Sequence, residues 1–171
     1  MVAAWNLNLF NNRARRVRGA NIAQTVNVLQ AMVLTKGEEM ILTPTYHVFE
    51  LFTVHHDALL LPTELEAGTY ALGEESIPAL SASASRDAQG RIHLTLANLD
   101  PTAPRTISAR ISGAEVSTVS GRILSGEAMN THNTFEAPTA VGPTAFQGAT
   151  FREGVLTIEL PARSVVVLEL S

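Results

Sequence analysis

The distribution of apolar residues changes character about one third of the way along the chain. In residues 3–16, Leu7, Phe10 and Ala14 recur at helical spacing, which predicts an amphipathic helix. After residue 57 the apolar residues occur in short runs separated by Pro, Gly and Asp, a texture typical of strands joined by turns. The pattern therefore predicts a short N-terminal part containing helices and a longer, mostly β part.

A second helix is predicted to start at Thr43. A threonine before Pro44 is a favourable N-cap, because proline fits the first helical turn, and Val48, Leu51 and Phe52 then share one face of the helix. Just before it, residues 35–39 read TKGEE, which predicts a turn with a glycine suited to positive φ.

Residues 17–35 are ambiguous by pattern alone. Ile22, Val26, Leu29 and Val33 are spaced as on one face of a helix. Residues 17–23, however, are short, rich in small residues and compatible with a fully buried strand. Periodicity leaves both readings open.

Strand alternation is clearest in residues 91–97, which follow a turn at residues 87–90. Ile92, Leu94 and Leu96 fall on one face and His93 and Thr95 on the other, which predicts a hairpin with one face buried. Further strands are expected within residues 77–85, 106–111, 117–124, 155–160 and 164–170. The last two flank residues 161–163 and suggest a final hairpin.

Composition narrows the class of protein. The chain has 171 residues, 46% of them hydrophobic, and a net charge of -4, which indicates a packed globular protein and gives no reason to expect nucleic acid or an anionic membrane as a partner. There is no cysteine, so disulfides and thiolate metal sites are excluded. No apolar run is long enough for a membrane helix, and no signal peptide is evident, so a cytoplasmic location is expected.

The residues able to carry chemistry form no recognised constellation. His55 and His56 are adjacent and point apart on a helix, and His47 is one residue off the spacing that favours a shared metal. No metal site is therefore expected from these or from His93 and His132. The nucleophile-elbow pattern of serine hydrolases and the phosphate-binding loop patterns are also absent.

Four runs carry a resemblance to a known family. Residues 17–35 (VRGANIAQTVNVLQAMVLT) and 43–61 (TPTYHVFELFTVHHDALLL) resemble the end of the catalytic barrel in the α-L-arabinofuranosidases of glycoside hydrolase family 51. Residues 121–138 and 154–170 resemble the sandwich that follows that barrel. The resemblance implies a mostly β fold: the last helix-strand-helix of a (β/α)8 barrel in residues 1–56, then a C-terminal jelly-roll-type β-sandwich in residues 57–171.

The resemblance also implies an activity that this chain cannot perform alone. The family removes terminal α-L-arabinofuranosyl groups from arabinan, arabinoxylan and their oligosaccharides with retention, without a metal or organic cofactor. Retention needs two carboxylates about 5–5.5 Å apart, and both precede the part that matches here. None of the carboxylates in turns, loops or mid-helix follows a barrel strand, so no catalytic residue is assigned among Glu38, Glu39, Glu50, Glu74 and Glu75.

Two residues are expected to serve the sugar pocket of the intact enzyme. By the resemblance, a strand at residues 17–23 ends at Gln24, whose amide can both donate to and accept from sugar hydroxyls. Asn27 is a second candidate for the same pocket. Without the resemblance, Gln24 would be read as a surface or capping residue.

The expected partners are the missing N-terminal catalytic barrel, arabinose-containing oligosaccharides in the intact enzyme, and further copies of the chain, since family members are often oligomers. Two alternatives remain: a carbohydrate-binding sandwich, or a purely structural or oligomerisation domain. The only tryptophan, Trp5, lies outside the sandwich, which disfavours sugar binding by stacking. The polar loop at residues 129–135 is either a binding loop or one whose Asn and Thr side chains satisfy its own backbone.

Overall fold

The computed structural model describes all residues from 1 to 171 and is built around one large antiparallel sheet. Its six strands lie in the order β10 (Thr144–Ala145), β9 (Val119–Ser125), β13 (Ser164–Leu170), β7 (Ile92–Asn98), β6 (Leu80–Arg86) and β3 (Leu59–Leu61). A three-stranded sheet has the order β11 (Ala149–Arg152), β12 (Val155–Leu160) and β8 (Arg105–Arg110). Two small hairpins are β1 (Val33–Lys36) with β2 (Glu39–Leu42), and β4 (Thr69–Leu72) with β5 (Glu75–Pro78).

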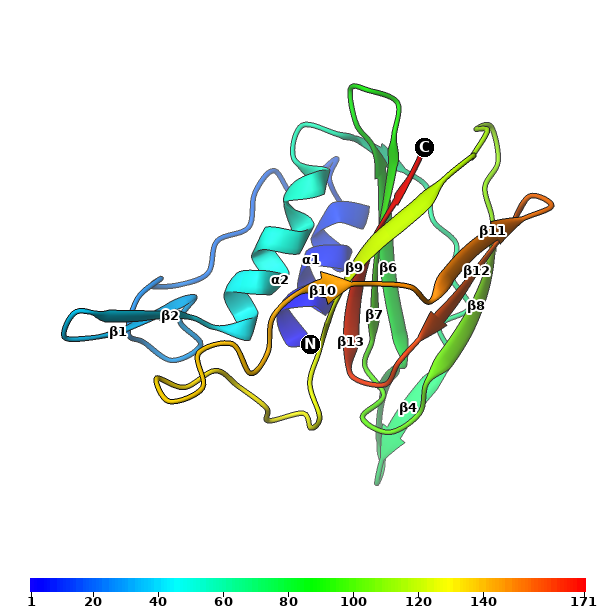
Figure 1. The fold of residues 1–171 in the computed structure, drawn as a ribbon. Coiled ribbons are helices and arrows are strands. Elements are labelled where there is room, and N and C mark those ends of the chain that lie inside the picture. Colours follow the sequence, from blue (N-terminus) through cyan, green and yellow to red (C-terminus); the bar gives the residue numbers. More distant parts are fainter.

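The molecule has three layers (Figure 1). Helices α1 (Val2–Asn12) and α2 (Pro44–Phe52), with the 3₁₀ turn η1 (Thr53–His55), cover one face of the six-stranded sheet, and the three-stranded sheet covers the other. The predicted β-sandwich is confirmed, and its jelly-roll type stays a prediction. No helix is long and apolar enough to cross a membrane.

Strand β13 is buried on both faces and joins the two cores. Val166, Leu168 and Leu170 belong to the core between the sheets, while Val165 and Val167 belong to the core under the helices. A strand buried on both sides reads as a continuous apolar run, which accounts for the sequence VVVLEL.

The helix starts follow the sequence closely. Thr43 is the N-cap of α2, its hydroxyl oxygen accepts a hydrogen bond from the backbone N–H of Tyr46 at 3.4 Å, and Pro44 opens the helix as predicted. The predicted face of Val48, Leu51 and Phe52 is buried. Helix α1 ends at Asn12 rather than at residue 16, because residues 13–16 turn through hydrogen bonds that span three residues.

Two strand predictions need correction. Strand β7 is buried on both faces rather than one, because α1 and η1 lie over the side that carries His93 and Thr95. Strands β12 and β13 are not a hairpin: β12 pairs with β8 and β11, whereas β13 pairs with β7 and β9. Each strand has both edges occupied in its own sheet, so residues 161–163 form a crossing between the sheets.

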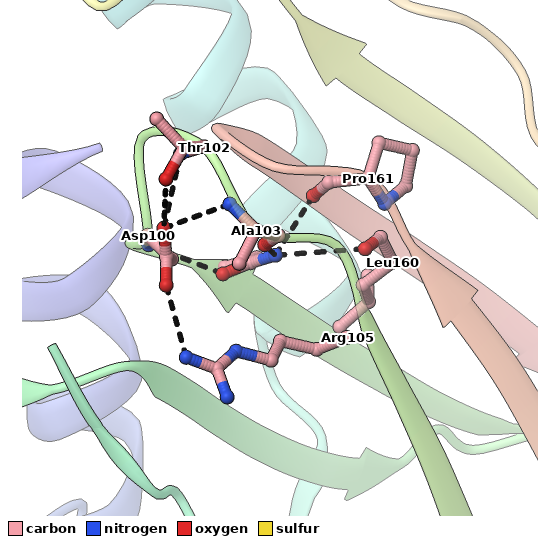
Figure 2. A network of polar contacts seen from close by, with 7 residues as sticks. Asp100, Thr102, Ala103, Arg105, Leu160 and Pro161 are labelled. Atoms are coloured by element: carbon pink, nitrogen blue, oxygen red, sulfur yellow. Dashed lines mark hydrogen bonds and ion pairs between the residues drawn. The ribbon is translucent and has the colours of Figure 1, made fainter.

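Polar side chains hold that crossing in place (Figure 2). The amide of Asn98 donates to the carbonyls of Ala103 at 2.9 Å and Pro161 at 3.0 Å, and its oxygen accepts from the N–H of Asp100. Asn98 is fully buried, so its amide ties the β7–β8 connection to the end of β12.

Asp100 forms the second half of the same corner. Its carboxylate accepts from the backbone N–H groups of Ala103 at 2.8 Å and Thr102 at 3.0 Å, and from the Arg105 guanidinium at 2.9 Å (Figure 2). These backbone donors, followed by the Arg105 guanidinium, lower the pKa of Asp100 to about 2.

Residues 17–23 do not form, in this chain, the strand that the family resemblance implied. Neither a helix nor a ladder includes them, and the nearest pairing is an isolated bridge between Val26 and Val33. A strand is defined by hydrogen bonds to a neighbour, and this chain supplies no neighbour there. The turn at residues 35–39 is confirmed, with Gly37 at φ 61°, and connects β1 to β2.

Gly121 allows a close approach inside the sandwich. A Cβ at this position would stand 2.6 Å from Leu168 Cδ2 and 2.9 Å from the Val167 carbonyl oxygen. We expect Gly121→Ala to lower the free energy of unfolding by about 1–3 kcal/mol in denaturant titrations, because the core must shift. Gly19→Ala, whose Cβ meets no atom within 4 Å, is the control and should stay within about 0.5 kcal/mol of the parent. Equal stability of the two variants would contradict the packing described.

The corner predicts a large effect at Asn98. Asn98→Ala leaves buried carbonyls without donors, each costing about 1–3 kcal/mol, so we expect a loss of about 2–4 kcal/mol in denaturant titrations. Asn130→Ala, in an exposed loop, should change stability by less than about 0.5 kcal/mol. An Asn98 variant as stable as the Asn130 variant would show that the corner does not depend on this amide.

Asp100 predicts a specific acid dependence. Its pKa is about 2 in the folded chain against an ordinary 3.8, so its contribution to stability is complete above about pH 4 and is lost as the pH falls towards 2. We expect Asp100→Asn to flatten the dependence of the unfolding free energy on pH in this window. The exposed Asp57 makes no side-chain hydrogen bond, so Asp57→Asn should keep the parent slope. An unchanged slope in Asp100→Asn would disprove the assignment.

Candidate functional site

Gln24 lies on the surface in the segment between α1 and β1. Its side chain is exposed and makes no hydrogen bond, and its backbone is left-handed with φ 52°. A left-handed backbone is uncommon for a residue other than glycine and occurs more often near functional sites. The side chain is therefore free to meet a ligand, and its contact with sugar stays a prediction.

Asn27 is exposed but has a local role. Its Oδ1 accepts from the backbone N–H of Thr35 at 2.7 Å, and its Nδ2 donates to the Thr35 hydroxyl at 2.7 Å. The left-handed backbone at φ 55° suits asparagine better than most residues. In this chain the Asn27 amide fastens the segment to β1, so it could support a pocket without touching sugar itself.

The carboxylates in the hairpin turns and on α2 form no catalytic arrangement. Glu38 and Glu39 are exposed at the β1–β2 hairpin, and Glu74 and Glu75 at the β4–β5 hairpin. Glu50 on α2 contacts His47 Nδ1 at 3.1 Å and Arg122 at 2.9 Å. The hydrogen bond from His47, with the Arg122 contact, lowers the pKa of Glu50, which makes it a surface ion-pair residue.

Two adjoining hollows lie beside the start of α2. They have volumes of about 310 and 270 Å³ and share Gln30, Pro44, Thr45, Met129 and Thr131 in their walls. Neither Gln24 nor Asn27 lines them. No pattern in the sequence indicates these hollows, because their walls come from several segments distant in the chain.

The loop at residues 129–135 has a structural role. Asn133 is buried, donates to the carbonyls of Leu42 at 2.8 Å and Val141 at 2.9 Å, and accepts from the Val141 N–H at 2.7 Å. The Thr131 hydroxyl accepts from the N–H of Ala128, closing a turn within the same connection. Of the two readings of this loop, the geometry favours the one in which its side chains satisfy backbone groups.

A cluster of buried polar side chains around the half-buried ring of His55 lies between the helices and the sheet. We call it the polar latch; it consists of Asn8 on α1, His55 at the end of η1, and three hydroxyl residues of the sheet, Ser83, Ser85 and Thr95. Asn8, Ser83 and Thr95 have no exposed surface. The only signal in the sequence is the run SASAS in β6, where serine alternates with alanine and so marks one face of a strand as polar.

His55 is the titratable group of this cluster. Its Nδ1 lies 2.7 Å from Ser85 Oγ and its Nε2 3.0 Å from Thr95 Oγ1. Burial, together with the positive potential of the neighbouring imidazoles His93 and His56, lowers the pKa of His55 to about 4. The ring is therefore neutral at physiological pH.

His93 has a separate partner. Its Nε2 lies 3.0 Å from a carboxylate oxygen of Asp87, which also accepts from Arg91 at 2.7 Å. The hydrogen bond from His93, then those from Arg91 and the backbone, lowers the pKa of Asp87. No three His, Asp or Glu side chains gather in a way that could hold a metal ion.

Comparison with known proteins identifies the family. The model of the α-L-arabinofuranosidase C-terminal domain matches residues 1–164. An intracellular exo-α-L-arabinofuranosidase of Bacteroides ovatus is 39% identical over 170 residues, which is 99% of this chain and 33% of that protein. An intracellular exo-α-(1→5)-L-arabinofuranosidase of Bifidobacterium longum is 30% identical over 90% of this chain and 29% of its own length.

Solved structures agree with this assignment. The family 51 arabinofuranosidase of Xanthomonas axonopodis pv. citri superposes with a TM-score of 0.97 at 45% identity, over 99% of this chain and 34% of that one. The thermostable family 51 enzyme of Thermotoga petrophila gives 0.85 at 27% identity, over 99% of this chain and 37% of that one. The chain thus spans about one third of the length of the relatives it matches. It belongs to the C-terminal domain family of the α-L-arabinofuranosidases of glycoside hydrolase family 51.

Proposed function

We propose that this chain works as the C-terminal part of a retaining enzyme that releases terminal α-L-arabinofuranosyl groups from arabinose-containing polysaccharides and oligosaccharides. The observation that carries the proposal is the superposition of nearly the whole chain on one third of a family 51 arabinofuranosidase. The other two thirds would supply the catalytic barrel with both carboxylates. The glutamates of the hairpin turns and of α2 form no catalytic arrangement, so the chain alone is inactive in this proposal.

Residues 1–56 are proposed to complete the barrel, with residues 57–171 as the sandwich that follows. Residues 17–23 carry no ladder hydrogen bonds in this chain, as expected of a barrel strand whose two neighbours lie elsewhere. The barrel would supply those neighbours. Association with the barrel would convert residues 17–23 from an exposed segment into a buried strand.

Gln24 is proposed to contact the sugar. Parallel strands of such a barrel end on the face where substrates bind, and Gln24 follows directly on residues 17–23. Its side chain is exposed and has no partner, so it can both donate to and accept from sugar hydroxyls. Asn27 would hold this segment in position through its two hydrogen bonds with Thr35.

Location, assembly and cofactor use follow from the same proposal. The relatives from Bacteroides ovatus and Bifidobacterium longum are named as intracellular enzymes, which supports a cytoplasmic location here. Strands β8 and β11 lie at the edges of the three-stranded sheet, where a strand from elsewhere could extend it, as could a second copy of the chain. The chemistry proposed needs two carboxylates and water, and no cofactor.

The test is complementation with a chromogenic α-L-arabinofuranoside. We expect no hydrolysis by the chain alone, and hydrolysis when the N-terminal two thirds of the Xanthomonas relative is added in trans. Activity of the chain alone would contradict the division of labour proposed. No activity in either case would favour the alternative of a carbohydrate-binding or structural sandwich, which arabinan-binding measurements then separate.

Gln24 gives a sharper test in the complemented enzyme. We expect Gln24→Ala to lower kcat/KM about 10-fold or more, because one or two hydrogen bonds to the sugar are lost. The control is Gln89→Ala, in an exposed turn of the sandwich, which should keep the parent kcat/KM. If both variants match the parent, Gln24 is a surface residue and has no role in the sugar pocket.

A further inference from the structure

We propose that the polar latch is an acid-sensitive device that holds α1 and η1 on the six-stranded sheet at neutral pH and releases them in acid. This device depends only on the geometry of the helix–sheet interface and is independent of the proposed enzymatic function. The residues of the latch play no part in the chemistry described above.

Helix α1 contacts the sheet through asparagines as well as through apolar side chains. Ala4, Asn8, Asn11 and Asn12 follow helical spacing, and of this face only Ala4 belongs to the apolar core. Asn12 donates to the carbonyl of Ala82 at 2.8 Å, and Asn11 to the Ser83 hydroxyl at 3.1 Å. The contact of α1 with its surroundings therefore combines these hydrogen bonds with the apolar packing of Ala3, Trp5 and Leu7 against the core under the helices.

The hydrogen bonds of the polar latch form a connected chain of donors and acceptors. Asn8 Oδ1 can only accept, and it receives the hydroxyl protons of Ser83 at 2.8 Å and Thr95 at 2.7 Å. In this orientation of the Asn8 amide, which leaves its Nδ2 buried without a partner, the Thr95 oxygen accepts from His55, so His55 carries its hydrogen on Nε2. Nδ1 of His55 then accepts from the Ser85 hydroxyl. This arrangement uses both ring nitrogens and requires a neutral imidazole.

A second proton on His55 would disrupt this pattern of donors and acceptors. Nδ1 would become a donor, and the Ser85 hydroxyl would have to turn its own proton elsewhere. The new positive charge would lie against the uncharged hydroxyl groups of Ser85 on β6 and Thr95 on β7, with Ser83 and the asparagines of α1 behind them.

The charged and titratable neighbours do not compensate that charge. His93 on β7 and His56 beside the ring both disfavour it. The carboxylate of Asp87 is already engaged by His93 and Arg91, and Glu169 on β13 contacts Arg91 at 3.3 Å. On α2, Glu50 is paired with His47 and Arg122. A protonated His55, whose ring is partly buried, therefore has no counter-charge, which is costly.

The pH window follows from the pKa of His55. With the helices seated the pKa is about 4, and with the ring released to water it returns to about 6.5. Between these values the released form binds the proton more tightly, so falling pH favours release and rising pH favours the seated form. The difference of the two values corresponds to an increase of roughly 100-fold in the opening constant between pH 7 and pH 4.

Hydrogen exchange read by NMR on the full chain tests the proposal. After correction for intrinsic exchange rates, we expect the protection of the α1 amides to fall roughly 100-fold from pH 7 to pH 4 while β13 stays protected. In His55→Gln the same ratio should shrink to within about 3-fold, because no group titrates in the latch. His132→Gln, in an exposed loop, should keep the full parent response.

Each other outcome counts against the latch. An equal fall in α1 and β13 would mean global acid unfolding, and an unchanged response in His55→Gln would assign the effect to another group. Should His55→Gln fail to fold, the titration of the His55 ring protons in the parent chain decides the question. A His55 pKa near 6.5 in the folded chain would overturn the proposal.

Discussion

Burial of both faces of the six-stranded sheet is the constraint on which the rest of the structure depends. Strand β13 contributes Val166, Leu168 and Leu170 to one side and Val165 and Val167 to the other, so neither face can be left to water. The three-stranded sheet covers one side and the helices cover the other (Figure 1). Removing either cover would expose a continuous apolar surface of the kind that drives association.

The two covers are held in different ways. Between the sheets the contact is almost entirely apolar, with Leu156, Ile158 and Leu160 fully buried opposite β13. Under the helices, apolar packing by Val48, Leu51 and Phe52 of α2 gives way to hydrogen bonds where α1 crosses β6 and β7. An apolar contact is largely indifferent to pH, whereas a hydrogen-bonded contact containing histidine is not, so of the two contact surfaces the helical one contains a titratable group.

The sequence predicted those features that depend on neighbouring residues. Thr43 and Pro44 determine the start of α2 by their own chemistry, and the apolar run in residues 164–170 identifies a strand wherever its partners lie. Pairing could not be predicted in the same way, because β12 and β13 are separated by only three residues yet belong to different sheets. The side chain of Asn98 holds the corner between the two sheets, but a single asparagine in the sequence does not indicate such a role.

Gln24 and Asn27 could be proposed as candidate site residues only through the family resemblance, since neither has a distinguishing periodicity. The polar latch could not be predicted either, because Ser83, Ser85 and Asn8 are residue types usually found at the surface, and only the packing of α1 over β6 buries them.

The segment between α1 and β1 has an unusual backbone. Within seven residues, Gln24, Asn27 and Gln30 all have left-handed backbones, and such conformations cost about 1–3 kcal/mol each unless surrounding contacts impose them. Of these three residues only Asn27 makes side-chain hydrogen bonds, and Leu29 is 94% exposed. The segment is exposed and carries apolar residues, so its present surroundings do little to offset the cost of these backbone conformations. In the proposed longer enzyme, the barrel would bury the apolar residues of this segment and leave the Gln24 amide facing the substrate.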